Sequence, residues 1–281
     1  MKPLNLAPFV GAVTLCVVCY GSFAPVALQT RTVRIAMVNV PEDVVRPLML
    51  DFTKEFGQQV EIVYTGNDPF AIARDGKADL VIAHYGHEGV APFVTGGFGR
   101  WPHPVFANQI ALIGPPSDPA DVRGLSDAAE AMRRIAATHS RFVVNNSSGN
   151  RYVEEILWTR AGSPAKGDWY LNRQSQGPQA ARDAAKEGAY TLWGVPPFLR
   201  LKRQLSLNLE PLVTADSIFQ RIMVAIVVNP QKVSGVNDAG AETFQNFLLT
   251  PATQARITAF RYPDLDRQVW WPAGRHNNAQ E

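Results

Sequence analysis

Strand-like segments and amphipathic helical segments alternate along this chain, and that order limits the fold more than any other feature. Residues 32–38 and 60–64 have the alternating, β-branched pattern of strands. Between them, the apolar residues of 42–56 recur at helical spacing, and Gly57 follows as a C-cap. Residues 78–83 are mostly apolar, as a strand buried in a parallel sheet is. Strands that alternate with helices indicate an α/β fold with a mostly parallel sheet.

The same alternation continues toward the end of the chain. A strand at residues 141–144 runs into a polar, glycine-containing loop at 145–150, and a long apolar strand is predicted at 222–228. The remaining predicted strands are 106–114 and 188–192, and the remaining predicted helices are 70–76, 125–138, 152–161, 178–187, 240–249 and 251–260.

The first 27 residues have the pattern of a secretory signal. Lys2 stands near the start, no charged residue occurs from residue 4 to 27, and residues 9–19 form a compact apolar core. A membrane anchor is the alternative, because the segment approaches the roughly 20 apolar residues that a spanning helix needs. Prolines and the polar stretch 20–22 shorten the apolar core. We therefore predict a cleaved signal peptide over residues 1–27 and a periplasmic location.

Cysteine usage and charge exclude several classes of protein. Cys16 and Cys19 are the two cysteines of the chain and both lie in the signal, so the mature part is predicted to have no disulfide and no thiol chemistry. The 27 Lys and Arg residues nearly balance the 25 Asp and Glu residues. A net charge of +2 does not favour nucleic-acid binding, which needs a concentrated basic face.

Catalytic and metal-binding motifs give no support for an enzyme. The chain contains no G-x-S-x-G, H-E-x-x-H or P-loop motif, and no G-x-G-x-x-G after a strand. We therefore predict neither an enzyme nor a cofactor. His84, His87 and His103 suggest a metal site, since two imidazoles three residues apart can share an ion. Loop histidines at a strand end are the better interpretation without a second close pair, and no metal is predicted.

The order of several short motifs identifies a family. The segments "GKADLVIAH" (76–84), "VFANQIALIGPPSDPADVRGLSDAAEAMRRIA", "RFVVNNSSGN", "EEILWTRAG", "WYLNRQSQG" and "FLLTPATQARITAF" follow one another along the chain. This order resembles the periplasmic tungstate-binding proteins of ABC importers, in the type II periplasmic-binding-protein superfamily. The resemblance covers roughly residues 33–260 and rests on the order of the motifs more than on any one of them.

The resemblance implies a fold, a partner and a mode of action. We expect two α/β lobes, each with a mixed, mostly parallel central sheet, that close on a ligand in the cleft between them. Strands near residues 106–109 and 222–225 would cross between the lobes. Lobe 1 would comprise residues 28–107 and 223–281, the latter with the C-terminal tail, and lobe 2 residues 108–222. The expected protein is a monomer that delivers its ligand to an ABC permease in the inner membrane.

Four loops are predicted to line the cleft, because ligands of open α/β sheets bind beyond the carboxyl ends of strands. These loops are 39–42, 84–87, 145–150 and 193–197, and helix N-termini there offer free N–H groups to an anion. The alternative for loop 145–150 is a turn that caps the following helix, and Trp193 is as well explained by packing as by stacking on a ligand. The candidate ligand-binding residues are Asn39, His84, Asn145, Asn146, Ser147, Ser148, Asn150, Arg151 and Trp193.

The chain departs from the family in these same loops. The resemblance implies a Thr/Ser-rich first loop, an arginine in the loop equivalent to 145–150 and a hydroxyl after its glycine. Here loop 38–42 has no hydroxyl, Asn145 stands at the arginine position and Asn150 at the hydroxyl position, which leaves Arg151 as the nearest substitute cation. We predict a binding protein for a small ligand, for example an oxyanion such as tungstate or molybdate, that serves an ABC importer. The alternative is a periplasmic ligand-sensing or scaffold protein with altered or lost ligand binding.

Overall fold

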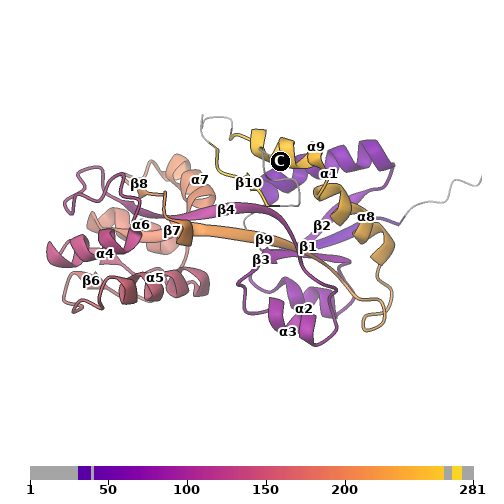
Figure 1. Ribbon diagram of the computed structural model, residues 1–281, viewed down its shortest axis with the longest axis horizontal. Helices are drawn as coiled ribbons and strands as arrows, with labels where there is room; N and C mark the ends of the chain where they lie inside the picture. Colours follow the sequence, from indigo (N-terminus) through magenta and orange to yellow (C-terminus); the bar gives the residue numbers. More distant parts are fainter. Residues whose placement is uncertain (1–30, 39–40, 263–267, 274–281) are drawn as a thin grey trace, which may run out of the picture.

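Two lobes joined by two long strands make up the molecule (Figure 1). The computed structural model describes residues 31–38, 41–262 and 268–273. Strands β4 (His103–Gly114) and β9 (Gln220–Val227) pair with each other and run from one lobe into the other. They occur where the resemblance implied the crossing strands. The predicted signal peptide, residues 1–27, lies outside the described residues.

Lobe 1 is built on a mixed sheet with the strand order β10-β4-β9-β3-β1-β2. β1 pairs in parallel with β2 and β3, whereas β9 is antiparallel to both β3 and β4. Helices lie on both faces of this sheet, with α2 and α3 on the side opposite α1 and α9 (Figure 1). The elements of this lobe are β1 (Val33–Met37), α1 (Glu42–Phe56), β2 (Val60–Thr65), α2 (Pro69–Arg74), β3 (Leu80–His84), α3 (Val90–Thr95), α8 (Asp238–Leu248), α9 (Pro251–Ala259) and β10 (Trp271–Pro272).

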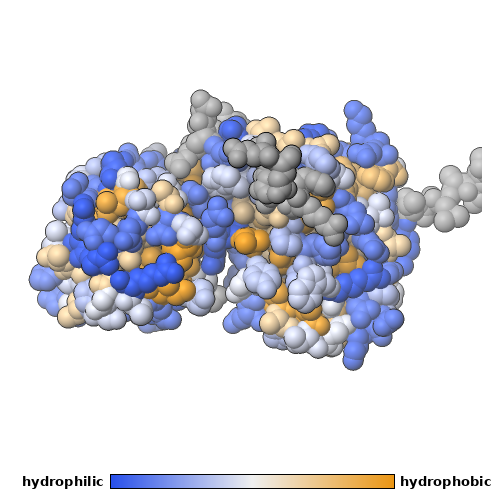
Figure 2. Space-filling view, in the orientation of Figure 1, coloured by the Kyte–Doolittle hydropathy of each residue, from blue (hydrophilic) through white to orange (hydrophobic). Residues whose placement is uncertain are grey.

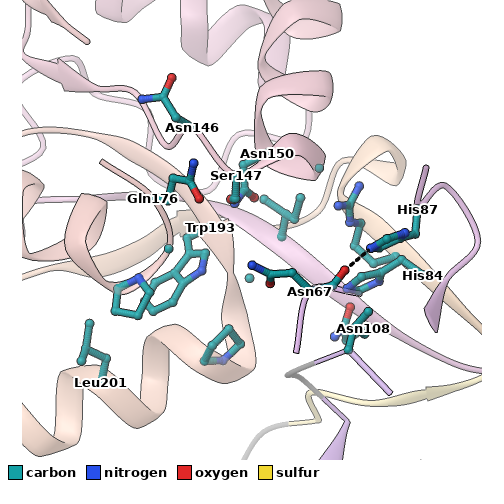
Figure 3. Close-up of a pocket in the computed structure, with 18 of the residues that line it drawn as sticks. Asn67, His84, His87, Asn108, Asn146, Ser147, Asn150, Gln176, Trp193 and Leu201 are labelled. Atoms are coloured by element: carbon teal, nitrogen blue, oxygen red, sulfur yellow. Dashed lines mark hydrogen bonds between the residues drawn. The ribbon is translucent and has the colours of Figure 1, made fainter. Parts of the chain in front are cut away.

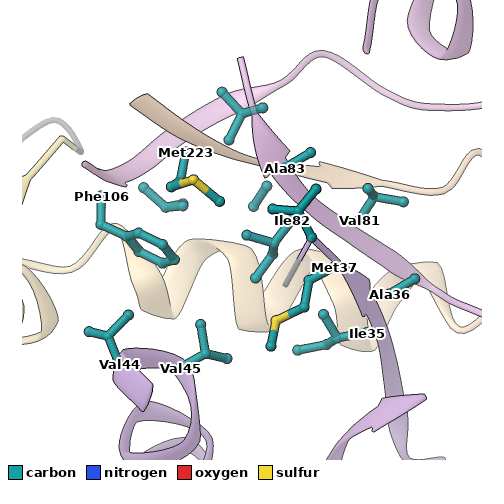
Figure 4. Close-up of a cluster of buried hydrophobic side chains, with 14 of the residues drawn as sticks. Ile35, Ala36, Met37, Val44, Val45, Val81, Ile82, Ala83, Phe106 and Met223 are labelled. Atoms are coloured by element: carbon teal, nitrogen blue, oxygen red, sulfur yellow. The ribbon is translucent and has the colours of Figure 1, made fainter. Parts of the chain in front are cut away.

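The lobe 1 core forms where α1 packs on this sheet. Ile35 and Met37 of β1 point toward Val44 and Val45 at the start of α1, and all four side chains are buried (Figure 4). Burying such a side chain contributes about 1.5–3 kcal/mol each. The packing therefore holds the carboxyl ends of β1 and β3 in place, and these ends lead into the cleft.

Lobe 2 has its own hydrophobic core around Phe142, Tyr190 and Phe219, all fully buried. The second half of β4 pairs antiparallel with β7 and β8, and β5 pairs in parallel with β6. The elements of this lobe are α4 (Ala128–Ala137), β5 (Phe142–Val143), α5 (Ser148–Arg160), β6 (Tyr170–Leu171), α6 (Pro178–Glu187), β7 (Thr191–Gly194), α7 (Val195–Leu205), β8 (Glu210–Val213) and the 3₁₀ turn η1 (Ser217–Phe219).

The predicted α/β fold with two lobes is confirmed, with two refinements. Parallel pairing is less extensive than predicted, because β4 and β9 are antiparallel to their neighbours. α5 begins at Ser148, four residues before the predicted start, so half of the predicted loop is the first turn of a helix. The lobe boundaries at 107/108 and 222/223 fall inside β4 and β9 and stay a prediction.

A helix that the sequence did not predict follows β7. Residues 193–197 were expected to form a loop, yet α7 starts at Val195 with Pro196 and Pro197 in its first turn. Proline is tolerated there, because the first N–H groups of a helix have no intrahelical partner. No helix among the described residues has both the length and the apolar character needed to cross a membrane.

Candidate functional site

The molecule is hollowed between the two lobes, where the described residues enclose a cavity of about 800 Å³ (Figure 2). Lobe 1 lines it with Asn67, His84, His87 and the exposed Glu88, among others. The crossing strands form its floor with Asn108, Ile110 and Arg221, and lobe 2 supplies the rest of the wall. A cavity of this size lies in the range of small-molecule sites.

Polar side chains from loop 145–150 lie on the lobe 2 side of this cavity. Asn146, Ser147 and Asn150 line it on the side across from His84 and His87 (Figure 3), although the amide of Asn146 is turned away from the gap and donates to Oδ1 of Asn172 at 3.0 Å. Ser147 is the N-cap residue of α5, and Nδ2 of Asn150 donates to its Oγ at 2.6 Å. These groups combine donors and acceptors at the N-terminus of a 13-residue helix, a position suited to an anion.

Asn145 supports this loop from behind instead of lining the cavity. Its side chain is 1% exposed, and its Oδ1 accepts hydrogen bonds from the Ser147 hydroxyl at 2.9 Å and the Gly177 amide at 2.9 Å. Because Gly177 also lines the cavity, Asn145 joins two segments of the wall. Asn145 therefore positions Ser147 and Gly177 and does not contact the ligand space itself.

On the lobe 1 side, His87 is held in one tautomer. Its Nδ1 accepts from the Gly89 amide at 3.0 Å, which leaves Nε2 to donate to the Asn67 carbonyl at 3.0 Å (Figure 3). Burial, with smaller contributions from Arg221 and His87, lowers the pKa of His84 to about 3. His84 is therefore a neutral imidazole at neutral pH, and its buried Nδ1 has no hydrogen-bond partner among the described residues.

Arg151, the predicted substitute cation, does not line the cavity. Its Nη1 donates to Glu154 at 2.8 Å and to the Tyr170 hydroxyl at 3.0 Å, and its Nη2 donates to Glu155 at 3.2 Å. Glu154 is 1% exposed, so the guanidinium neutralises a buried carboxylate inside lobe 2. Because it pairs with Glu154, the Arg151 side chain points away from the cleft, and the prediction that it binds the ligand is wrong.

Two arginines that the sequence analysis missed do line the cavity, Arg200 and Arg221. Arg200 comes from α7 of lobe 2 and forms an ion pair with Asp43 on α1 of lobe 1, so it is already neutralised. Arg221 is the second residue of β9. One clue to Arg221 was present in the sequence: it is the one charged residue in the otherwise uncharged segment 217–228.

The other three predicted ligand-binding residues differ in where the structure places them. Trp193 of β7 lines the cavity although it is only 8% exposed. Ser148 is the first residue of α5, and Asn39 lies outside the described residues. Within the described part of the chain, no group of three or more His, Cys, Asp and Glu residues is arranged to hold a metal ion.

Comparisons with known proteins agree with this geometry. Residues 24–252 match the family model described as the PBP superfamily domain. The chain is 28% identical over 234 residues to a candidate ABC transporter anion-binding protein of Haloferax volcanii, covering 82% of this chain and 68% of that protein. It is also 28% identical over 214 residues to the tungstate-binding protein TupA of Peptoclostridium acidaminophilum, covering 75% of this chain and 74% of that protein.

Among solved structures, a similar one is the tungstate-binding protein TupA from Desulfovibrio alaskensis G20. The two chains superpose with a TM-score of 0.76 at 26% identity, covering 87% of this chain and 99% of the other. The predicted resemblance to tungstate-binding proteins of ABC transporters is thereby confirmed.

Proposed function

We propose that this chain, which belongs to the PBP superfamily, captures a small oxyanion between its lobes and delivers it to the permease of an ABC importer. The names of two relatives support an anion as the ligand, one for anion binding and one for tungstate binding. The ligand-binding residues are those that reach the cavity, including His84, Asn146, Ser147, Asn150 and Trp193.

The observation that carries this proposal is the first turn of α5 opening into the cleft. Its polar side chains line the cavity, and the amide of Gly149 donates no hydrogen bond to any described residue. Free amides and the positive end of the helix dipole attract an oxyanion. The two lobes and their crossing strands supply the hinge that closure on a ligand needs.

The proposed setting follows from the same family. We place the protein in the periplasm as a monomer without enzymatic activity, exported by the predicted signal at residues 1–27. Its partner is the inner-membrane permease. Tungstate and molybdate are the first ligands to test, because the family resemblance points to them while the altered loops predict a different selectivity.

The first experiment is a thermal-shift screen of the purified protein against tungstate, molybdate, sulfate, phosphate and small carboxylates. A ligand at 100 times its Kd stabilises the folded state by about 2.7 kcal/mol, which produces an easily measured rise in Tm. We expect at least one of these anions to raise Tm and to reduce the radius of gyration in small-angle scattering. No shift with any anion would contradict the proposal.

A matched pair of serine variants connects the shift to the cleft. Ser147→Ala removes a hydroxyl from the cavity wall, whereas Ser126→Ala removes an exposed hydroxyl just before α4. We expect the first variant to reduce the anion-induced shift and the second to leave it unchanged. Equal shifts in both variants would place the anion elsewhere on the molecule.

A further inference from the structure

Arg221 enters the cavity from its floor, on the crossing strand β9. In the pairing of β4 with β9, Arg221 lies opposite Asn108, and both residues line the cavity. The neighbouring Phe219 and Met223 are fully buried, so the backbone on each side is fixed by packing and by the β ladder. The guanidinium is therefore presented by a rigid element and not by a loop.

No acidic partner neutralises this guanidinium. Among the described residues the guanidinium of Arg221 has no ion-pair or hydrogen-bond partner, unlike that of Arg34 with Asp79 or of Arg200 with Asp43. Burial lowers the pKa of Arg221, and no neighbouring carboxylate opposes that effect. Glu88 also lines the cavity but makes no ion pair with Arg221. A partly buried cation without a counter-ion is unfavourable, and such charges are normally paired.

The guanidinium of Arg221 also lies next to a second positive group, which makes its lack of a counter-ion more unfavourable. A β-carbon built on Gly149, in the first turn of α5, would lie 1.9 Å from Nη2 of Arg221, so the guanidinium rests against the start of this helix. A helix N-terminus carries roughly half a positive charge. Two positive groups in contact at the wall of a cavity repel each other unless an anion lies between or beside them.

The nearby imidazole does not supply negative charge either. His84 is close enough for Arg221 to contribute to its lowered pKa, and it stays neutral at neutral pH. Its Nδ1 is buried with no hydrogen-bond partner among the described residues. A cation and the free amide of Gly149 thus occur at one part of the cavity, which is also lined by the neutral imidazole of His84.

We propose that Arg221 is the counter-ion of the bound ligand, and that its guanidinium and the free amide of Gly149 in α5 hold one oxyanion group between the lobes. This inference rests on the proposed function and names the residue that makes the site select a negatively charged ligand. Residues 145–150 carry no Lys or Arg of their own, so Arg221 supplies the positive side chain at this wall. An inorganic oxyanion and the carboxylate of an organic acid present the same group, and a guanidinium can bind either with two hydrogen bonds.

Calorimetric titration of Arg221→Gln, Arg221→Lys and wild type tests the assignment. The titrants are tungstate, molybdate, sulfate and phosphate in one arm, and acetate, pyruvate and benzoate in the other. Removing one partner of a buried charge pair should weaken binding of the wild-type ligand at least about 30-fold. Arg221→Lys should bind with intermediate affinity. Arg182→Gln changes an exposed arginine that does not line the cavity and should bind within about twofold of wild type.

Stability without ligand separates this role from a structural one. We expect ligand-free Arg221→Gln to melt at the same temperature as wild type or higher, because an unpaired cation has been removed, while the anion-induced rise in Tm disappears. Wild-type affinity in Arg221→Gln would overturn the assignment but leave anion capture intact. If wild type binds no titrant in either arm, the proposed function fails and the assignment fails with it.

Discussion

Gly149 and Arg221 are in contact across the cleft floor: a β-carbon on Gly149 would lie 1.9 Å from Nη2 and 3.1 Å from Cζ of Arg221. The first residue belongs to α5 of lobe 2 and the second to the crossing strand β9. The guanidinium can therefore lie where it does only because residue 149 has no side chain.

Gly149→Ala should weaken anion binding without unfolding the protein. The atom that the new methyl group meets is the end of a flexible side chain, so Arg221 moves aside while the backbone stays in place. Alanine is also a better helix former than glycine. We expect an unchanged or higher Tm without ligand and a loss of affinity of about tenfold, equivalent to about 1.4 kcal/mol.

The control for this substitution is Gly86→Ala, since a β-carbon on Gly86 meets nothing within 4 Å. Titration calorimetry on both variants gives the comparison. Equal affinities would show that the place of the Arg221 guanidinium against α5 has no bearing on the ligand.

Asn145→Ala should reduce both stability and affinity. The side-chain Oδ1 of Asn145 accepts from Ser147 and Gly177, so its loss leaves a partly buried amide and a partly buried hydroxyl without their partner. An unsatisfied buried group costs about 1–3 kcal/mol. The expected result is a free energy of unfolding lower by that amount in urea titrations, with weaker anion binding.

Asn172→Ala provides the comparison for Asn145→Ala. The Oδ1 of the exposed Asn172 accepts from Asn146 at 3.0 Å and from the Gln174 amide at 3.2 Å, both at the surface. Its removal should cost no more than about 0.5 kcal/mol. If both asparagine variants lost the same stability, Asn145 would not be the residue that joins the two segments of the wall.

The sequence predicted elements well where local pattern and capping agree. The predicted helices 42–56 and 178–187 coincide with α1 and α6, and each is followed by a glycine in the left-handed conformation, Gly57 and Gly188. α7 was missed because two adjacent prolines were interpreted as a loop, although the first turn of a helix accepts them. Short strands such as β6, Tyr170–Leu171, depend on tertiary pairing and have no periodicity to detect.

The site was only partly predictable, for a different physical reason. Strand ends and polar loops can be located from the sequence, and residues of three predicted loops, 84–87, 145–150 and 193–197, do reach the cavity. The direction of a long side chain depends on its partners. Arg151 is three residues before Glu154, a spacing that favours an ion pair on one helix face, and this local signal should have argued against a cleft role. The direction of Arg221 depends on pairing with β4, which no local pattern encodes.

Asp79→Ala should be the most destabilising single change in lobe 1. The fully buried carboxylate of Asp79 accepts from the Arg34 amide at 2.8 Å, from Nη2 of Arg34 at 2.6 Å and from the Asn237 amide at 2.8 Å. It thus holds together β1, β3 and the segment before α8. Breaking a buried pair costs about 3–5 kcal/mol. Asp75→Ala, which breaks an exposed pair with Lys77, should cost less than about 1 kcal/mol, and equal losses in urea titrations would contradict this interpretation.

Acidification should destabilise the ligand-free protein through His84. Burial is the main reason that the pKa of His84 in the folded protein is about 3, whereas an unfolded histidine has a pKa near 6.5. Between these values the unfolded chain binds a proton that the folded chain does not, so stability is fully present above pH 6.5 and falls as the pH decreases toward 3. The slope contributed by this one group is about 1 kcal/mol per pH unit.

Urea titrations of wild type and His84→Asn between pH 7 and 4.5 should show a shallower loss of stability in the variant, because its side chain does not titrate. His139→Asn, at an exposed position in lobe 2, should keep the wild-type slope. Parallel curves for wild type and His84→Asn would mean that His84 is protonated in the folded protein, and a cationic imidazole would then share the charge of the bound anion with Arg221.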